Sequence, residues 1–277
     1  MKPSATLWAL GLVMASLGAT AATNAPATPA AVPAANHLAQ IQSTGQVRVC
    51  IWPDYYGISY RNPKTLELSG IDVDMARELA RDLGPGVAVD FVDSSFARLI
   101  EDVTGDRCDL AMFAIGVTAA RAEKLRFTKP HMESDIFAIT TRSNLRIGQW
   151  ADIDRNGVVV AVAKGTLHES VMHNRLQQAR LVVLDTPFAR EQEVESGRAD
   201  VFMTDYPYSQ RMLANTDWAR LVSPPSSFHV TPYAYAMAPG DDRWHERIET
   251  FVQTIKQDGR LLASARIYRL EPMVRLD

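Results

Sequence analysis

The segment CDLAMFAI, residues 108–115, is a nearly unbroken apolar run of strand length. Such a run is typical of a central strand buried on both faces, and strands of this kind belong mostly to parallel sheets covered by helices. Two earlier segments predict further strands: QVRVCIW, residues 46–52, alternates with a period of two, and GVAVDFV, residues 86–92, is also rich in valine. The first half of the chain therefore predicts a sheet with this run near its centre.

Helical patterns separate these strands. In GIDVDMARELARDLG, residues 70–84, apolar side chains recur at helical spacing, Asp72 or Asp74 is available as an N-cap, and Gly84 ends the run. FARLIEDVTG, residues 96–105, predicts a second helix. Because strands and helices alternate, this half predicts an α/β unit whose sheet is mostly parallel.

The same pattern begins again at residue 157. The expected elements are a strand from 157 into Gly165, a helix over 168–179, a strand over 179–186, a helix over 187–197 opened by Asp185 or Thr186 before Pro187, a strand over 199–205, a strand over 233–239, an amphipathic helix over 242–257 and a shorter helix over 261–272. Two α/β blocks in series predict two lobes, and 277 residues are enough to form both.

Charge and motifs exclude several classes of function. The formal net charge is −3 and no cluster of five or more Lys and Arg residues occurs, so we expect no nucleic-acid partner. No G-x-S-x-G elbow and no phosphate loop occurs. His168 and His173 in HESVMH are five residues apart where a zinc protease motif needs four, which turns the second ring by roughly 140°. We therefore expect no metal, no cofactor and no catalytic residue of these types.

The N-terminus resembles an export signal. Lys2 supplies a positive start, an apolar stretch follows, and Ala19-Thr20-Ala21 fits the small-x-small cleavage pattern, so we predict a signal peptide over residues 1–21. A membrane anchor is less well supported, because the apolar core is shorter than the roughly 20 residues that a span needs. Residues 22–37 are rich in Ala and Pro and predict a disordered leader, with structure beginning near His37.

Two cysteines, Cys50 and Cys108, are the only ones in the chain. Cys50 lies in the first predicted strand and Cys108 directly precedes the central one, so a disulfide between them is geometrically plausible if those strands are neighbours. The alternative is that both are small buried apolar side chains.

Two charged residues stand where predicted strands end. Arg121 follows the central strand of the first block, and Asp205 ends a strand of the second. Because parallel sheets bind ligands outside the carboxyl ends of their strands, a cation from one lobe and a carboxylate from the other predict a cleft for a ligand that carries both charges. Two structural alternatives remain: Arg121 pairs with Glu123 or Asp109 on the surface, and Asp205 caps a following segment.

Five segments, in this order and at this spacing, resemble the periplasmic solute-binding proteins of the polar amino acid type, family 3, over about residues 45–270. They are GIDVDMARELARDLG, FARLIEDVTGDRCDLAM, IGVTAARAEKLRFTKPH, VAVAKGTLHES and GRADVFMTD. The resemblance implies a type II periplasmic-binding-protein-like fold, with two mostly parallel sheets joined by a two-strand hinge. The crossings are expected near residues 139–142 and 230–233. Lobe 1 would comprise residues 38–140 plus 232–277, and lobe 2 residues 141–231.

The resemblance also implies roles for individual residues. Arg121 would bind the α-carboxylate of an amino acid, helped by backbone N–H groups at a helix start, and Asp205 would bind its ammonium group. Tyr55 and Phe96 match aromatic positions around the ligand, although Phe96 is also expected to be partly core. Trp52 stands where many members have an acidic residue for a basic ligand, which argues against lysine, arginine or histidine.

Two hydroxyl positions of the family are missing here. Gly116 stands five residues before the arginine, where a Ser or Thr is usual, so only a backbone group can bind the ligand at this position. Leu167 follows Gly165-Thr166 where the second hydroxyl is expected. We expect Thr118 and Thr166 to compensate, and the ligand to be an amino acid bound less tightly or a different small anion.

The function implied is a monomeric periplasmic receptor that captures an amino acid for an ABC permease and has no enzymatic activity. Two alternatives stay open. The second block resembles cyclohexadienyl dehydratase, but Tyr208 stands where that enzyme has its general-acid glutamate, three residues after the aspartate, and a phenol is a weaker acid. The RVC and GDRCD segments also resemble solute-binding-like partners of periplasmic quinoprotein dehydrogenases.

Overall fold

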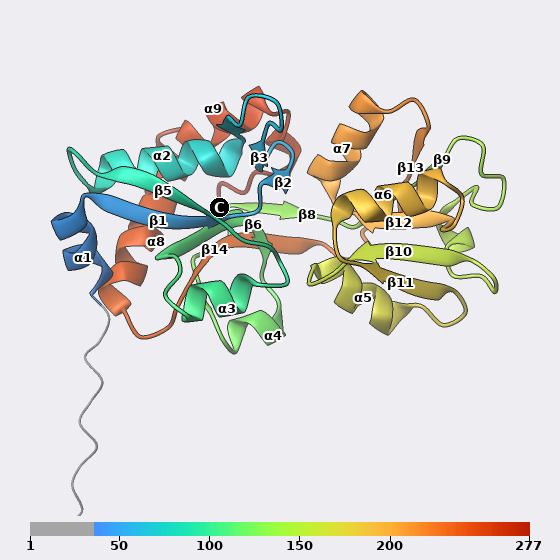
Figure 1. Ribbon diagram of the computed structural model, residues 1–277, viewed down its shortest axis with the longest axis horizontal. Coiled ribbons are helices and arrows are strands. Elements are labelled where there is room, and N and C mark those ends of the chain that lie inside the picture. Colours follow the sequence, from blue (N-terminus) through green and yellow to red (C-terminus); the bar gives the residue numbers. More distant parts are fainter. Residues whose placement is uncertain (1–35) are drawn as a thin grey trace, which may run out of the picture. The chain divides into compact units, whose positions relative to one another are not determined.

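The structure is a computed structural model that describes residues 36–277 (Figure 1). The predicted signal peptide and residues 22–35 of the predicted leader lie outside the described residues. The last two leader residues belong to the fold, because the Asn36 side chain caps α1 (His37–Thr44) and the His37 backbone N–H donates to Asp241. Across residues 36–277, no helix has both the length and the apolar character that a bilayer crossing requires.

The first sheet contains β6 (Leu110–Gly116) at its centre, and every residue of this strand is buried, as its apolar sequence predicts. The strand order is β5-β1-β6-β14-β7, with β8 also paired to β14. The other strands are β1 (Gln46–Ile51), β5 (Ala88–Asp93), β7 (Arg126–Phe127), β8 (Met132–Ser134) and β14 (Thr231–Met237). A separate small sheet contains β2 (Asp54–Tyr55), β3 (Ser59–Arg61) and β4 (Leu68–Ser69).

Helix α2 (Ile71–Leu83) follows the predicted pattern and packs on β1, β5 and β6. The predicted aspartate cap is wrong, because the N-cap is Gly70 and no side chain caps the helix. Asp72 instead points into the core and accepts a 2.7 Å hydrogen bond from the Ala114 N–H of β6, while Asp74 accepts one from the Ser264 hydroxyl. The sequence shows which residues are acidic, but the packing of α2 on the sheet decides where they point.

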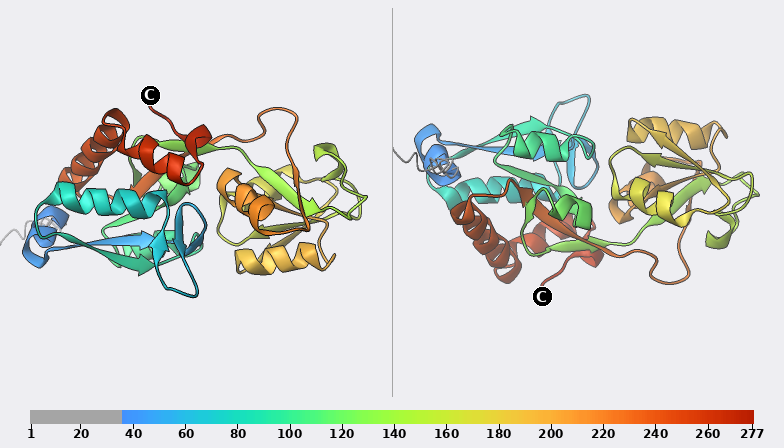
Figure 2. Two further views of the ribbon diagram at one scale, coloured as in Figure 1. Left: turned by 90° about the horizontal axis from the view of Figure 1, so that it is seen from above. Right: turned by 90° about the horizontal axis from the view of Figure 1, so that it is seen from below.

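The remaining helices of this sheet are α3 (Leu99–Thr104), the short α4 (Ala119–Ala122), α8 (Asp242–Gln257) and α9 (Arg260–Ile267), with 3-10 turns η1 (Trp150–Asp152) and η2 (Glu271–Met273) elsewhere. Helix α8 has the bounds that its apolar spacing predicts, and its Trp244, Ile248, Phe251 and Ile255 are buried. Helix α9, red in Figure 2, lies beside the teal α2. The C-terminal part of the chain therefore returns to the sheet formed by the N-terminal part.

The second sheet has the strand order β11-β10-β12-β9-β13. Its strands are β9 (Phe137–Thr141), β10 (Val159–Ala163), β11 (Arg180–Leu184), β12 (Val201–Thr204) and β13 (Ala219–Val222). Helices α5 (Leu167–Arg175) and α6 (Pro187–Glu195) were predicted, and Thr186 caps α6 as expected. Helix α7 (Tyr206–Asn215) and β13 were not predicted, since Tyr206-Pro207 resembles a turn although Pro207 lies in the first turn of a helix.

Both sheets are mixed rather than mostly parallel. The parallel pairs are those that the sequence predicted, β5-β1-β6 in the first sheet and β11-β10-β12 in the second. Antiparallel strands extend each sheet, because β14 pairs antiparallel with β6 and β9 pairs antiparallel with β12. These added strands are the ones that carry the chain between the two sheets.

Two segments connect the sheets, and both can be followed in Figure 2. The first crossing lies between Ser134 of β8 and Phe137 of β9, because Ile139 already pairs with Phe202 inside the second sheet. The expected crossing at residues 139–142 is therefore placed several residues too late. The return runs over residues 223–230 and reaches the first sheet at Thr231, which pairs with Ser134.

Cys50 and Cys108 form a disulfide, with Cα atoms 5.6 Å apart, that joins β1 to the loop before β6. The bond spans 58 residues of sequence, and closing a loop of that length in the unfolded chain stabilises the fold by about 4 kcal/mol. We expect the Cys50→Ala/Cys108→Ala double variant to lose about that much stability in urea unfolding. Dithiothreitol should destabilise the wild type equally and leave the variant unchanged; a wild type insensitive to the reductant contradicts the prediction.

Candidate functional site

A cavity of about 20 Å³, room for about one water molecule, lies between the two sheets. Its lining draws on both lobes, and it includes Trp52, Tyr55, Phe96, Gly116, Arg121, Thr166 and Asp205 from the predicted set. The cation and the carboxylate that the strand ends predicted therefore face one cavity.

Arg121 is held across the gap between the lobes. It lies in α4, just after β6, and is only 8% exposed. Its Nη1 donates to the Gly116 carbonyl at 2.9 Å, and its Nη2 donates to the Gly165 carbonyl of the second lobe at 3.0 Å. Burial lowers the pKa of Arg121 to about 10, so the group stays charged at neutral pH.

The surface alternative for Arg121 is wrong. Asp109 binds Arg48 instead, with Oδ1 at 2.6 Å from Nη2, and within residues 36–277 Arg121 forms no ion pair with Glu123. The guanidinium carbon lies 5.3 Å from the ring centroid of Phe96, so a cation–π contact adds to its placement.

Asp205 caps the following helix, as one alternative predicted, and it also lines the cavity. Its Oδ1 accepts the Tyr208 N–H at 3.3 Å and caps α7. Its Oδ2 accepts hydrogen bonds from the hydroxyls of Tyr55 and Tyr233, two residues of the first lobe. Burial raises the pKa of Asp205. The three hydrogen bonds favour the charged carboxylate and so offset part of this rise.

The aromatic side chains form one wall. The rings of Trp52, Tyr55 and Phe96 meet edge to face, with centroids 5.0 to 6.0 Å apart. Phe96 also contacts Phe113 of β6 and is partly buried, as expected of a residue shared between core and cleft. Tyr55 is buried, and its hydroxyl reaches Asp205 across the gap.

The predicted compensation by threonine hydroxyls is not supported by the geometry. Thr118 does not line the cavity, because its hydroxyl caps α4 by accepting the Arg121 N–H. Thr166 does line it, but its hydroxyl donates to the Ala163 carbonyl at 2.6 Å. A side chain at Gly116 would meet Thr231 and Leu167 at 3.0 and 3.1 Å, so the hydroxyl usual in the family has little room here.

The lining residues that were not predicted as site residues are Ala114, Leu167, His168, Arg190, Thr204, Tyr208 and Tyr233. Arg190 could have been found from its spacing, because Pro187, Arg190 and Val194 are the buried residues of α6 and an arginine on the buried face of a helix is unusual. The sequence pointed to His168 only through a zinc motif with the wrong spacing, and this residue also lines the cavity.

His168 is buried and neutral. Burial, together with the positive charges of Arg190 and Arg121, lowers its pKa to about 3. The exposed His173 lies on the other side of α5, as the five-residue spacing predicted.

We expect His168 to make the fold acid-sensitive. Below pH 6.5 the unfolded chain binds a proton at this ring and the folded protein does not, so stability is complete above pH 6.5 and falls until about pH 3. The loss between pH 7 and pH 5 amounts to about 2 kcal/mol. Urea unfolding of His168→Gln at both pH values should lack this part of the loss, whereas His173→Gln should retain it; equal losses in both variants would refute the assignment.

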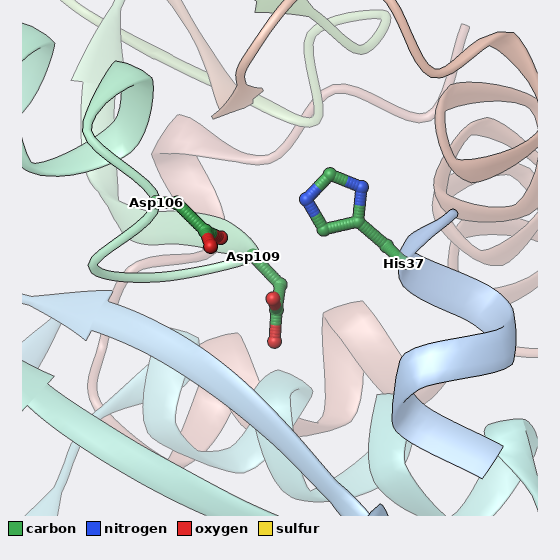
Figure 3. Close-up of side chains that lie close together, drawn as sticks. All are labelled: His37, Asp106 and Asp109. Carbon is green, nitrogen blue, oxygen red and sulfur yellow. The ribbon is translucent and has the colours of Figure 1, made fainter. Parts of the chain in front are cut away.

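A second group of polar side chains lies near the start of α1. Ligand-type atoms of His37, Asp106 and Asp109 lie within 4.8 Å of one another, and Figure 3 shows them reaching in from α1 and from the loop before β6. The carboxylates already bind Arg48, whose Nη2 is 2.6 Å from each, and His37 Nδ1 lies 2.9 Å from Asp241. The group is thus an ion-pair network around an arginine.

Comparison with known proteins gives the same picture as the fold. The sequence profile of the bacterial extracellular solute-binding proteins, family 3, matches residues 47–269. Cyclohexadienyl dehydratase of Pseudomonas aeruginosa is 29% identical over 227 residues, which cover 82% of this chain and 83% of the enzyme. The ABC transporter glutamine-binding protein GlnH of Bacillus subtilis is 21% identical over 224 residues, covering 80% and 81%.

Solved structures share the two-lobed α/β fold. The ancestral amino acid-binding protein AncCDT-1, a precursor of cyclohexadienyl dehydratase, superposes with a TM-score of 0.76 at 27% identity, covering 84% of this chain and 99% of that one. The substrate-binding protein AbpA of Streptococcus pneumoniae, bound to L-arginine, has the same TM-score at 22% identity, covering 84% and 98%. With a family match over most of its length, this chain belongs to the bacterial extracellular solute-binding proteins, family 3.

Proposed function

We propose that this protein captures an amino acid or a similar small zwitterion between its lobes, in the periplasm, and presents it as a monomer to an ABC permease. The observation that carries the proposal is that Arg121 of the first lobe and Asp205 of the second line the same cavity. A planar guanidinium binds a carboxylate through two parallel hydrogen bonds, and a buried carboxylate with tyrosine partners suits an ammonium group. Membership of family 3 supports the same reading.

Closure gives the site its strength. The cavity holds about 20 Å³, so the lobes must open to admit a solute and then close around it. In the closed arrangement Tyr55 reaches Asp205 and Arg121 reaches the Gly165 carbonyl, and both contacts bridge the lobes. A solute that enters takes over these groups, and its charges are then bound where water is excluded and electrostatic contacts are stronger.

A thermal-shift screen over the amino acids and small carboxylates tests the proposal. A solute at about 100 times its dissociation constant adds roughly 2.7 kcal/mol of stability, which raises the midpoint of a domain this size by about 5 to 10 °C. If every amino acid and small acid leaves the midpoint unchanged, the receptor function fails. The role of a partner to a periplasmic dehydrogenase then becomes the better explanation.

Dehydratase activity is the second candidate, favoured by the identity with cyclohexadienyl dehydratase. Tyr208 lies where the general acid is expected, and its hydroxyl donates to Glu191. Burial raises the pKa of Tyr208, which makes the phenol a still weaker acid. We therefore propose a binder, and we expect no aromatic product when the purified protein is incubated with prephenate; measurable turnover would reverse this choice.

A further inference from the structure

Arg190 is a second buried cation on the cavity wall. It is 2% exposed, and its guanidinium carbon lies 4.6 Å from the ring centroids of both Phe202 and Tyr208. One hydrogen bond holds it, from Nη1 to the Met203 carbonyl at 2.8 Å, and its buried Nε has no partner. A guanidinium has five N–H donors, and a buried charge usually has a counter-charge. The two rings compensate for only part of its lost hydration.

The cavity contains too little negative charge for its two arginines. Among the described residues, neither Arg121 nor Arg190 forms an ion pair, and Asp205 is the one carboxylate on the wall. That carboxylate already accepts two tyrosine hydroxyls and a backbone N–H. The balance is two guanidinium groups against a single acid, which leaves an excess positive charge facing the cavity.

His168 strengthens the same reading independently. Its side chain is 6% exposed and lines the cavity, and in the described part of the chain neither ring nitrogen has a partner of normal hydrogen-bond geometry, although the backbone of Thr204 is near enough to favour the protonated ring weakly. A neutral imidazole always carries one N–H donor. An unpartnered donor beside two cations suits an anionic group of a bound solute.

We infer that the solute carries two anionic groups, as a dicarboxylate does, with one bound by Arg121 and the other by Arg190 and His168. The inference rests on the proposed function and narrows its ligand class. Asp205 can exchange a tyrosine hydroxyl for an ammonium or hydroxyl group of the same solute, so an acidic amino acid fits every charged group. A neutral amino acid would leave Arg190 without a counter-charge, and a basic one would meet Trp52 and a positive wall.

Matched acid and amide pairs test the inference by isothermal calorimetry. The pairs are L-glutamate with L-glutamine, L-aspartate with L-asparagine, and succinate with succinamate, measured on protein freed of co-purified solute by unfolding and refolding. In each pair the two molecules have nearly the same shape and differ in one charge. The acid that fits best should bind about tenfold to a hundredfold more tightly than its amide, because a hydrogen bond to a charged group is replaced by a neutral one.

Substitutions then assign the difference to Arg190. Arg190→Met keeps an unbranched side chain without the charge and should bring the acid to within about threefold of its amide, while amide binding changes little. Arg198→Met, which removes an exposed arginine just after the same helix, should leave the ratio as in the wild type. Arg190→Lys keeps the charge and should retain part of the preference for the acid. This variant shows whether the loss in Arg190→Met comes from the missing charge or from a folding defect.

The outcomes separate this inference from the proposed function. A wild type that binds the amides as tightly as the acids, or binds only neutral or basic amino acids, overturns the inference and leaves the receptor function standing. If the wild type binds no solute of any class, both the inference and the proposed function are wrong. A preference for the acids that survives in Arg190→Met also overturns the role given to this residue.

Discussion

Arg121→Ala is expected to raise the dissociation constant of the cognate solute by roughly 30-fold to several thousand-fold. Removing one member of a buried, hydrogen-bonded charge pair costs about 2 to 5 kcal/mol, and each 1.4 kcal/mol is a factor of ten. Two contacts are lost together, because the guanidinium also donates to the Gly165 carbonyl of the other lobe. The variant should therefore bind weakly and also close less readily.

Calorimetry with the solute that gives the largest thermal shift measures this effect. Arg126→Ala is the matched control, because Arg126 lies five residues further along, is partly exposed and pairs with Asp242 outside the cavity. The control should bind as the wild type does. A change of less than threefold in Arg121→Ala would remove this residue from the binding site.

Gly165→Ala is expected to hold the lobes apart. Gly165 has a φ of +75°, and a Cβ there would lie 2.4 Å from the Ala97 nitrogen and 2.7 Å from the Phe96 carbonyl carbon, both backbone atoms of the other lobe. Backbone cannot rotate away as a side chain can, so the gap must widen by about 1 Å or the core must strain, at a cost of roughly 1 to 3 kcal/mol. We expect solute affinity to fall by about fivefold to more than a hundredfold.

Gly197→Ala is a close control for this substitution. Gly197 lies in the same lobe with a φ of +76°, and a Cβ there would meet nothing within 4 Å. An alanine in the left-handed conformation should destabilise both variants equally, by about 1 to 2 kcal/mol. Only Gly165→Ala should also lose solute affinity. In X-ray scattering with solute present, only this variant should show a larger radius of gyration than the wild type. Equal affinities in the two variants would mean that this glycine does not control closure.

Local patterns in the sequence were sufficient for much of the fold. The bounds of α8 follow from apolar side chains at steps of three and four, and β6 follows from an apolar run too long and too uniform for an exposed strand. Arg121 and Asp205 could be named because strand ends in α/β folds point at ligands. These are short-range features, and each depends on no more than about 15 neighbouring residues.

The sequence predicted strands that connect the lobes, but it did not reveal their direction. Whether β9 and β14 run antiparallel to their neighbours depends on partners about 60 and 120 residues away, such as Phe202 for Ile139 and Ile115 for Ala234. The same applies to Asp72, which a local pattern assigns to a helix cap and which packing turns toward β6.

By itself, the sequence determined the order of the elements, the two α/β lobes and the two charges that face each other, because these follow from periodicity and from where strands end. Only the tertiary structure decided that Arg190 and His168 join the cavity, that Tyr55 closes onto Asp205 and that Thr118 stays outside. The reason is physical: the charge balance of a cavity depends on which side chains of distant segments are buried together without partners, and no single segment carries that information.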